Sequence, residues 1–174
     1  YLSVNPPRQP PSAIGNTFTF YIEIEDATRL YGWQIRLKYD PAVLECTQIQ
    51  EEPFLKQNGA STWFLIVENN PTLGECEATC TQISAAVYGA SGSGRLMSLK
   101  FTVKNSGNSY LNFMLVKMGD RNSNPLPLSA AVDGWYGDET GGSQGFVISN
   151  ASWGQECPAG TYDSTWGKYL TVWD

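Results

Sequence analysis

Cysteine is the side chain with the most reactive chemistry in this sequence, which holds four of them: Cys46, Cys76, Cys80 and Cys157. Four thiols could form two disulfides, bind one zinc ion as thiolates, or stay reduced in a core. A zinc site would need two closely spaced pairs, and only the pair Cys76 and Cys80 is present. We therefore expect two disulfides, which are typical of proteins from an oxidising compartment.

The sequence alone leaves three disulfide pairings open. Cys46 lies in the predicted strand LECTQIQ, and Cys80 lies in the middle of ATCTQIS. We predict that these two cysteines meet across a sandwich of sheets. Cys76 would then pair with Cys157 and anchor the C-terminal residues 150–174.

Groups that could transfer a proton or attack a substrate are few. The sequence contains no histidine, so Ser-His and Cys-His arrangements are excluded. The acidic pairs Glu51-Glu52 and Asp138-Glu139 could serve a glycosidase, but both fall in predicted loops and favour solvated charge. GASGSG, residues 89–94, matches neither a nucleophile elbow nor a phosphate loop and predicts a tight turn. We predict no catalytic residue and no cofactor.

One stretch has part of the spacing of a calcium loop. Asp120, Asn122 and Asn124 occupy alternate positions, as the first ligands of such a loop do. Pro125 follows them, and no glutamate stands where the loop would end. We therefore predict a β-turn and no metal ligand, with a weak calcium site as the alternative.

The charge balance limits the classes of partner. The 11 basic and 17 acidic residues give a net charge of -6, and the scattered basic residues form no patch for a row of phosphates. No apolar run approaches the roughly 18 residues of a membrane span. Asn150-Ala151-Ser152 is a glycosylation sequon, which is consistent with secretion. We expect a chain outside the cell or at its surface, with Asn150 as the candidate glycosylation site and with neither a nucleic-acid partner nor a membrane span.

Alternating apolar and polar residues predict the elements that carry these side chains. In residues 17–25 four apolar side chains share one face: Phe18, Phe20, Ile22 and Ile24. In residues 30–39 the predicted inward residues are Trp33, Ile35, Leu37 and Tyr39, and the outward ones are Gln34, Arg36 and Lys38. Asp40-Pro41 ends that strand, because proline lacks the N–H of a ladder. Further strands are predicted at 44–50, 62–67, 78–86, 96–104, 110–118 and 145–149.

Short strands at this spacing, with no helical period between them, indicate an antiparallel sandwich. We predict an all-β jelly roll of about nine strands over residues 1–149, with an extension, residues 150–174, packed on the same domain.

The order of these pieces resembles the cohesin family, the jelly-roll modules of extracellular scaffolding proteins whose partners are dockerins. The likeness lies in IGNTFTFYIEIEDATRLYGWQIRLKYDPAVLECTQI and in GASGSGRLMSLKFTVKNSGNSYLNF, and it extends over roughly residues 2–148. It is closest to cohesin-like domains of archaeal and bacterial surface proteins. The resemblance implies a non-catalytic module whose partners are other protein chains.

The predicted strand YLNFMLVKM is apolar on both sides, which is unusual for a sheet face in water. Leu111, Phe113 and Leu115 share one side, and the other carries Tyr110, Met114, Val116 and Met118. Either the C-terminal segment or a partner chain covers the second side. The resemblance places this strand in the sheet that cohesins use for dockerins. The predicted partner-binding residues are Gln34, Arg36, Lys38, Tyr110, Met114 and Val116.

Both ends of the chain contain a short alternating strand. The first, YLSV, includes Tyr1, Leu2 and Val4, and the last, GKYLTVWD, includes Leu170 and Val172. A sheet edge can accept such a strand. We predict that at least one of them completes a sheet in a neighbouring subunit, with pairing inside its own chain as the alternative.

The function predicted from these features is a subunit of a cell-surface scaffold or filament that self-associates by strand addition. One alternative is a dockerin-binding cohesin. Another is a carbohydrate-binding module that binds glycans through exposed tryptophans, the candidates being Trp63, Trp135, Trp153, Trp166 and Trp173.

Overall fold

The computed structural model describes residues 1–83 and 88–138, together with the backbone of residues 162–163 and 168–169. The strands of the N-terminal half are β1 (Leu2–Asn5), β2 (Arg8–Gln9), β3 (Thr17–Leu30), β4 (Gly32–Lys38), β5 (Leu44–Glu51), β6 (Thr62–Asn70) and β7 (Glu75–Gln82). They are followed by β8 (Ala90–Val103), β9 (Ser109–Gly119), β10 (Ala131–Val132) and β11 (Gly134–Tyr136). A 3-10 helix, η1 (Pro53–Gly59), connects β5 to β6. The short strands β12 (Tyr162–Asp163) and β13 (Lys168–Tyr169) pair with each other.

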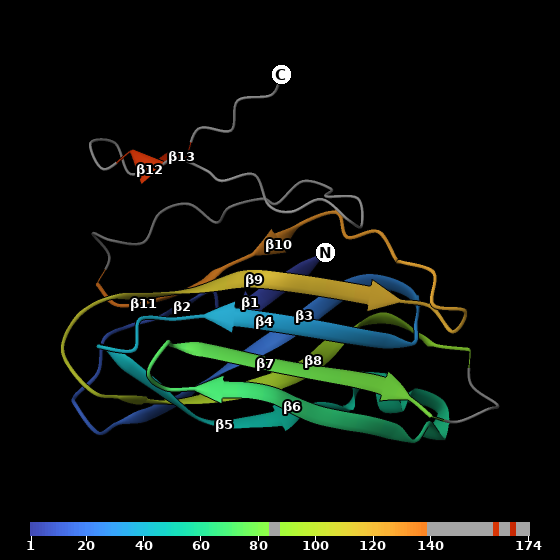
Figure 1. The fold of residues 1–174 in the computed structure, drawn as a ribbon, viewed down its shortest axis with the longest axis horizontal. Coiled ribbons are helices and arrows are strands. Elements are labelled where there is room, and N and C mark those ends of the chain that lie inside the picture. The colour runs from blue at the N-terminus through green and yellow to red at the C-terminus, as the bar shows by residue number, and fades with distance from the viewer. Residues whose placement is uncertain (84–87, 139–161, 164–167, 170–174) are drawn as a thin grey trace.

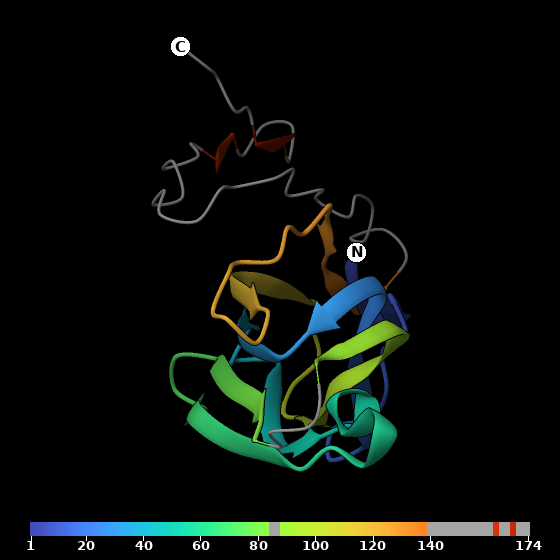
Figure 2. The ribbon, with the colours of Figure 1, turned by 90° about the vertical axis from the view of Figure 1, so that its right-hand side faces the viewer.

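The strands form a sandwich of two sheets, which confirms the predicted all-β fold. The five-stranded sheet has the order β10-β1-β3-β8-β5, and the six-stranded sheet has the order β2-β11-β9-β4-β7-β6. Figure 1 shows the six-stranded sheet in front of the other, and Figure 2 views the sandwich from one end. Each sheet therefore turns one face to the core and the other outward.

Apolar residues on the inner faces of the two sheets form the core, as the alternation predicts. Phe20 and Ile22 of β3 are fully buried, and so are Ile35 and Leu37 of β4. Burying a side chain of this size stabilises a fold by about 1.5–3 kcal/mol. Inward packing of these residues fixes the outward direction of the polar residues that alternate with them.

A tight corner holds the ends of three strands of the six-stranded sheet. The N–H of Tyr39 donates to the carbonyl of Gly74 in the β6–β7 turn (2.8 Å), and the N–H of Asp40 donates to Ser109 Oγ at the start of β9 (2.9 Å). Gly74 has φ +68°, and a Cβ there would lie 2.2 Å from the Tyr39 carbonyl oxygen. Only glycine fits this approach, and the corner sets the register of β4 against β7.

The prediction that GASGSG is a turn is wrong, because β8 already begins at Ala90. This part of β8 pairs irregularly with the end of β3, with Ala27 opposite Gly92 and Leu30 opposite Ala90. The hydroxyls of Ser91 and Ser93 accept the N–H groups of Arg29 (3.0 Å) and Asp26 (3.2 Å). Those serine bonds replace the ladder bonds that the irregular pairing leaves out.

The N-terminal strand pairs inside its own chain, which is the alternative stated for it above. That at least one terminal strand adds to a neighbour stays a prediction. β1 lies between β3 and β10, antiparallel to the first and parallel to the second. Leu2 and Val4 are buried, and Tyr1 is partly exposed. The strand is therefore interior and part of the core. Leu170 and Val172 of the predicted C-terminal strand lie outside the described residues, as do most residues of the predicted extension.

The described cysteines do not form the predicted bridge between Cys46 and Cys80. Cys46, Cys76 and Cys80 are buried free thiols. Cys80 instead donates a hydrogen bond to Glu51 Oε1 (3.4 Å). Cys157, and with it the predicted Cys76–Cys157 bridge, lies outside the described residues, as does the predicted glycosylation site Asn150.

Candidate partner-binding face

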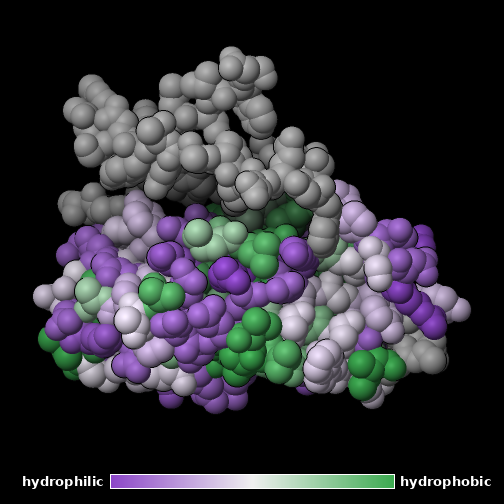
Figure 3. All heavy atoms as spheres, viewed as in Figure 1, coloured by the Kyte–Doolittle hydropathy of each residue, from purple (hydrophilic) through white to green (hydrophobic). Residues whose placement is uncertain are grey.

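The outward side of β9, β4, β7 and β6 is the surface on which the predicted binding residues Gln34, Arg36 and Lys38 lie. Residues paired across neighbouring strands share a face, so the register assigns the members of this surface, called here the outer face. They are Gln34, Arg36, Lys38, Trp63, Leu65, Glu68, Asn70, Glu75, Glu77, Thr79, Thr81, Asn112, Leu115 and Lys117. Figure 3 shows this side of the molecule, with hydrophilic residues over much of it and separate hydrophobic patches along the lower edge.

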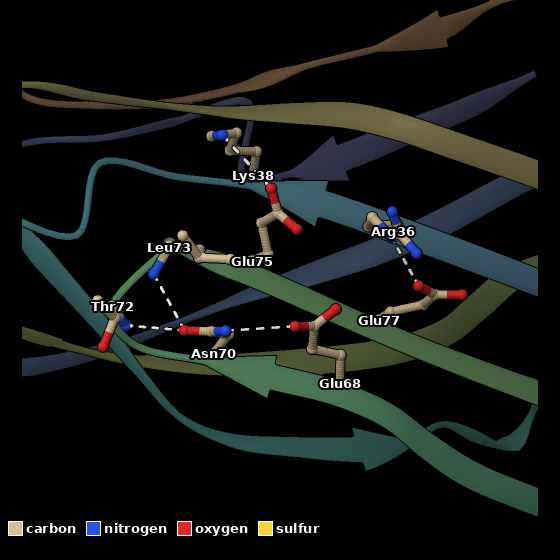
Figure 4. A network of polar contacts seen from close by, with 8 residues as sticks. All are labelled: Arg36, Lys38, Glu68, Asn70, Thr72, Leu73, Glu75 and Glu77. Atoms are coloured by element: carbon tan, nitrogen blue, oxygen red, sulfur yellow. Dashed lines mark hydrogen bonds and ion pairs between the residues drawn. The ribbon is translucent and has the colours of Figure 1, made fainter. Parts of the chain in front are cut away.

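A buried carboxylate lies in the middle of the outer face. Glu77 of β7 has a side chain only 1% exposed although it points away from the core. Its Oε2 accepts from Arg36 Nε (2.6 Å), and its Oε1 accepts from the amide of Gln34. Arg36 itself stays 41% exposed. The carboxylate therefore holds two predicted binding residues of β4, Gln34 and Arg36, in fixed positions. Figure 4 shows the contact between Arg36 and Glu77.

A second set of polar contacts orders the end of the face near the β6–β7 turn. Lys38 Nζ lies 3.4 Å from Glu75 Oε1. Asn70 Oδ1 accepts the N–H groups of Thr72 (3.1 Å) and Leu73 (3.0 Å), and Asn70 Nδ2 donates to Glu68 Oε1 (3.3 Å). Exposed pairs of this kind add little stability each. Their effect here is to give the charged side chains defined places (Figure 4).

The opposite end of the outer face is apolar. Trp63 and Leu65 of β6 are 57% and 44% exposed. They lie opposite Thr81 and Thr79 of β7, whose side chains share the face. Exposed apolar side chains next to a polar network are typical of a protein interaction surface.

The sequence prediction missed Glu75, Glu77, Trp63 and Leu65 as members of this surface. A signal for the first two is present in ECEATC, where Glu75 and Glu77 alternate with inward Cys76 and Ala78. The alternation shows that both glutamates point outward. It does not show that Gln34 and Arg36 cover Glu77.

Val116 does not belong to the outer face, so the side of the sheet to which the sequence prediction assigned it is corrected. β9 contains a bulge: Leu37 of β4 pairs with Phe113, but the next residue, Arg36, pairs with Leu115. The extra residue, Met114, is 52% exposed. Beyond it the sides are exchanged, because side chains alternate with a period of two. Val116 therefore packs against the core, and Leu115 points outward.

The same bulge explains why β9 is apolar on both sides in the sequence. Leu111 and Phe113 before the bulge and Met118 after it are all buried. Within the described chain, the core thus covers apolar residues of β9 on both sides of the bulge. Tyr110 and Met114 remain as exposed large apolar residues of this strand.

Tyr110 and Trp135 form an aromatic pair beside the outer face. Their ring centroids lie 4.4 Å apart, and Trp135 Nε1 donates to the Asp138 carbonyl (3.3 Å). Trp135 is only 8% exposed, whereas Tyr110 is 45% exposed. Trp135 therefore offers no open platform for a sugar ring. Trp63 is exposed, and the candidates Trp153, Trp166 and Trp173 lie outside the described residues.

The predicted turn at Asp120 is confirmed. Asp120 Oδ1 accepts the N–H groups of Asn122 (2.8 Å) and Asn124 (2.9 Å), and Oδ2 accepts from Asn124 Nδ2 (3.0 Å). The hydrogen bonds from Asn124 lower the pKa of this carboxyl below its usual value. The carboxylate is thus used by its own turn.

The other acidic candidates are also engaged or exposed. Glu51 pairs with Lys56 (2.8 Å) and accepts from the hydroxyl of Thr62 (2.5 Å). Asp138 is exposed, and Glu139 lies outside the described residues. In the part of the chain that the structure describes, no three His, Cys, Asp or Glu side chains are grouped as metal ligands would be. No helix found there is long and apolar enough to cross a membrane.

Comparison with known proteins gives a family and a set of similar folds. A family model described as the cohesin domain matches residues 8–136. One similar solved structure is the sixth cohesin of scaffoldin B from Acetivibrio cellulolyticus, in complex with a dockerin. This cohesin is 14% identical, the match covers 79% of this chain and 97% of the cohesin, and the TM-score is 0.62. A non-cellulosomal cohesin from the archaeon Archaeoglobus fulgidus is 18% identical, with coverage of 80% and 91% and a TM-score of 0.61. A type I cohesin–dockerin complex from Clostridium thermocellum is 15% identical, with coverage of 78% and 90% and a TM-score of 0.61. Among curated proteins, the comparison found no match.

Proposed function

This chain belongs to the cohesin family, and we propose that it is a non-catalytic module that binds a dockerin-type protein through the outer face of β9, β4, β7 and β6. The observation that carries the proposal is the buried Glu77, which fixes Gln34 and Arg36 before any partner arrives. Positioning side chains in advance reduces the ordering cost of association. Two of the similar solved structures are complexes with dockerins, which supports this class of partner.

The chemistry of the face suits a partner with both apolar and charged groups. Trp63 and Leu65 provide exposed apolar area at one end. The three cations Arg36, Lys38 and Lys117 balance the three anions Glu68, Glu75 and Glu77, so the face has no strong net charge. Specificity would then depend on matching individual charges and shape. We place this module outside the cell or at its surface, as the family resemblance implies.

Calorimetry against a panel of dockerins from the same source tests the proposal. Arg36→Glu reverses a charge in the middle of the face and places it beside Glu77, so we expect at least a tenfold loss of affinity. Arg95→Glu is the matched control: Arg95 also pairs with a glutamate, Glu23 (2.9 Å), and is 45% exposed, but it lies on the five-stranded sheet. Thermal unfolding checks that both variants fold. Equal loss in both variants, or no binding by the wild-type protein to any dockerin, would contradict the proposal.

Self-association in a surface scaffold or filament is a second candidate function, favoured by the edge of the six-stranded sheet. β6 ends the strand order of that sheet, and its Trp63, Leu65 and Val67 are all exposed. An exposed apolar edge can pair with another chain. Analytical ultracentrifugation of the wild type and Leu65→Lys tests this candidate: we expect concentration-dependent oligomers that the lysine abolishes. A wild type that remains monomeric rules it out.

Glycan binding would need Trp63, which is the exposed candidate among the described tryptophans. Quenching of tryptophan fluorescence by a panel of polysaccharides, compared between the wild type and Trp63→Ala, separates this activity from protein binding. We expect no quenching that depends on Trp63.

A further inference from the structure

Two of the buried thiols face each other across the core, one from each sheet. Cys46 lies on β5 of the five-stranded sheet and Cys76 on β7 of the six-stranded sheet. Both are inward and almost wholly buried. The nearby thiol of Cys46, together with burial, raises the pKa of Cys76 well above its usual value.

Independent contacts place the backbones of these two residues close together. Asn69 is the cross-strand partner of Cys76, and its side-chain amide donates to the Cys46 carbonyl (3.1 Å). The N–H of Cys46 donates to the hydroxyl of Tyr39 (3.2 Å), at the end of the strand that pairs with β7. β5 and β7 approach to Cα distances of 8 Å or less, which is closer than the roughly 10 Å between ordinary packed sheets. A disulfide needs a Cα separation of roughly 4–7 Å, so the two strands come near the range in which a bridge can form.

We propose that Cys46 and Cys76 form a disulfide that ties the two sheets together when the chain folds under oxidising conditions. The two thiols lose two protons and two electrons as the sulfur–sulfur bond forms. A small-molecule disulfide, such as oxidised glutathione, takes up the electrons and is reduced to two thiols by exchange. Exchange requires a thiolate, so it proceeds while Cys76 is still accessible during folding, and reshuffling retains the pairing that the closed sandwich allows.

Cys80 serves as the control within the same strand. It lies on the same inward side of β7 as Cys76, but its thiol contacts Glu51. Burial, followed by the nearby Glu51, raises its pKa to about 12. Cys76 and Cys80 thus differ in the group that each faces. If the proposal holds, Cys46 is cross-linked to Cys76 and not to Cys80.

Refolding the full chain with oxidised and reduced glutathione, followed by alkylation and peptide mapping, tests the pairing. Trypsin leaves Cys76 and Cys80 in one peptide, but cleavage after glutamate separates them at Glu77. We expect the Cys46 peptide joined to the Cys76 peptide. A Cys46–Cys80 or Cys46–Cys157 peptide, or alkylation of both Cys46 and Cys76, would overturn the proposal.

Thermal unfolding gives a second readout. A bridge that closes the loop between Cys46 and Cys76 is expected to raise the Tm by roughly 10 °C. Reductant present during refolding should remove that increase in the wild type and in Cys80→Ala, and it should have no effect on the double variant Cys46→Ala and Cys76→Ala. If the double variant does not fold, the peptide map of the wild type still shows whether Cys46 and Cys76 are joined. A Tm of the wild type that does not respond to reductant contradicts the bridge.

Discussion

Glu77 carries a charge on an outward position and is nevertheless buried. Gln34 and Arg36 lie over its two oxygens, so the polar bonds of the carboxylate are made within the protein. Removing one partner of a buried pair is costly when the other charge stays buried. Arg36 is 41% exposed, so water can solvate it after such a change.

We therefore expect a moderate effect from Glu77→Gln. The free energy of unfolding should fall by about 1 kcal/mol, near the net value of one hydrogen bond, and affinity for the partner should fall because Gln34 and Arg36 lose their fixed positions. Urea unfolding and calorimetry measure the two effects. Glu75→Gln is the control, since its exposed pair with Lys38 should contribute at most about 0.5 kcal/mol. An equal loss in both variants would contradict the special role of Glu77.

Asp133 makes the stability of the fold depend on pH in the direction opposite to most carboxylates. Burial raises its pKa to about 6, and the opposing hydrogen bond from the N–H of Phe113 does not offset it. The folded chain therefore holds a proton that the unfolded chain releases at lower pH. The stabilisation from this group is complete at pH values below about 4, its ordinary pKa range, and is lost as pH rises toward about 6.

Asp133→Asn tests this assignment, because the amide can still accept from Phe113 but cannot ionise. At pH 7 the variant should be more stable than the wild type by on the order of 1–2 kcal/mol, reduced from the full linkage value because the site is only partly buried. The difference should vanish near pH 4. Urea unfolding at several pH values measures it, and a constant difference across this range would show that ionisation is not the cause.

The bulge in β9 decides which residues of that strand reach the core. Before Met114 the odd-numbered residues Leu111 and Phe113 point inward, and after it the even-numbered residues Val116 and Met118 do. One inserted residue thus places apolar side chains on the inner side along the whole strand. It also presents Leu115 and Lys117 on the outer face.

Paired substitutions test the change of side. Val116→Asp should destabilise the fold by about 2–3 kcal/mol, because it puts a charge against the core. Leu115→Asp should change stability by less than about 1 kcal/mol, because its side chain points outward. Thermal or urea unfolding distinguishes them. If Leu115→Asp is the more damaging, the register of β9 differs from the one described.

The predictions from sequence succeeded where alternation ran without interruption. In β3 and β4 every second residue is apolar, and Phe20, Ile22, Ile35 and Leu37 are buried as that pattern requires. The prediction from alternation failed at Val116. YLNFMLVKM is apolar at nearly every position, so the sequence gives no sign that the bulge falls at Met114.

The cysteine pairing could not be predicted from alternation either. Cys76 and Cys80 are four residues apart in one strand, so both point inward and either could meet Cys46. Which of the two faces Cys46 depends on the offset between the two sheets, and the alternation within one strand does not give that offset. Likewise, nothing in YLSV distinguishes an interior strand from a strand that joins another subunit.

The first and last strands of the described sandwich pair with each other. β1 lies between β3 and β10, and β2 pairs with β11. Gly134, at the start of β11, lies against Val4 of β1, where an added Cβ would come within 2.6 Å of Val4 Cγ1. The N-terminal strand is thus part of the folding unit.

Leu2→Ala measures how much the N-terminal strand contributes to stability. Leu2 is fully buried, so the substitution should lower the free energy of unfolding by about 2–4 kcal/mol. Ser3→Ala, on the other side of the same strand, should have an effect of less than about 0.5 kcal/mol. A small effect of Leu2→Ala in urea unfolding would show that β1 is not anchored in its own chain.

The pairing of β1 with β10 and of β2 with β11 also sets when a newly made chain can fold. Leu2 is matched with Ala131 and Arg8 with Trp135, so β1 and β2 leave the ribosome well before the partners with which they pair. Such distant pairings slow folding, because a long loop must close before they form. A ribosome-bound chain that stops short of residue 136 should therefore remain sensitive to protease, and resistance should appear only after that residue has left the exit tunnel.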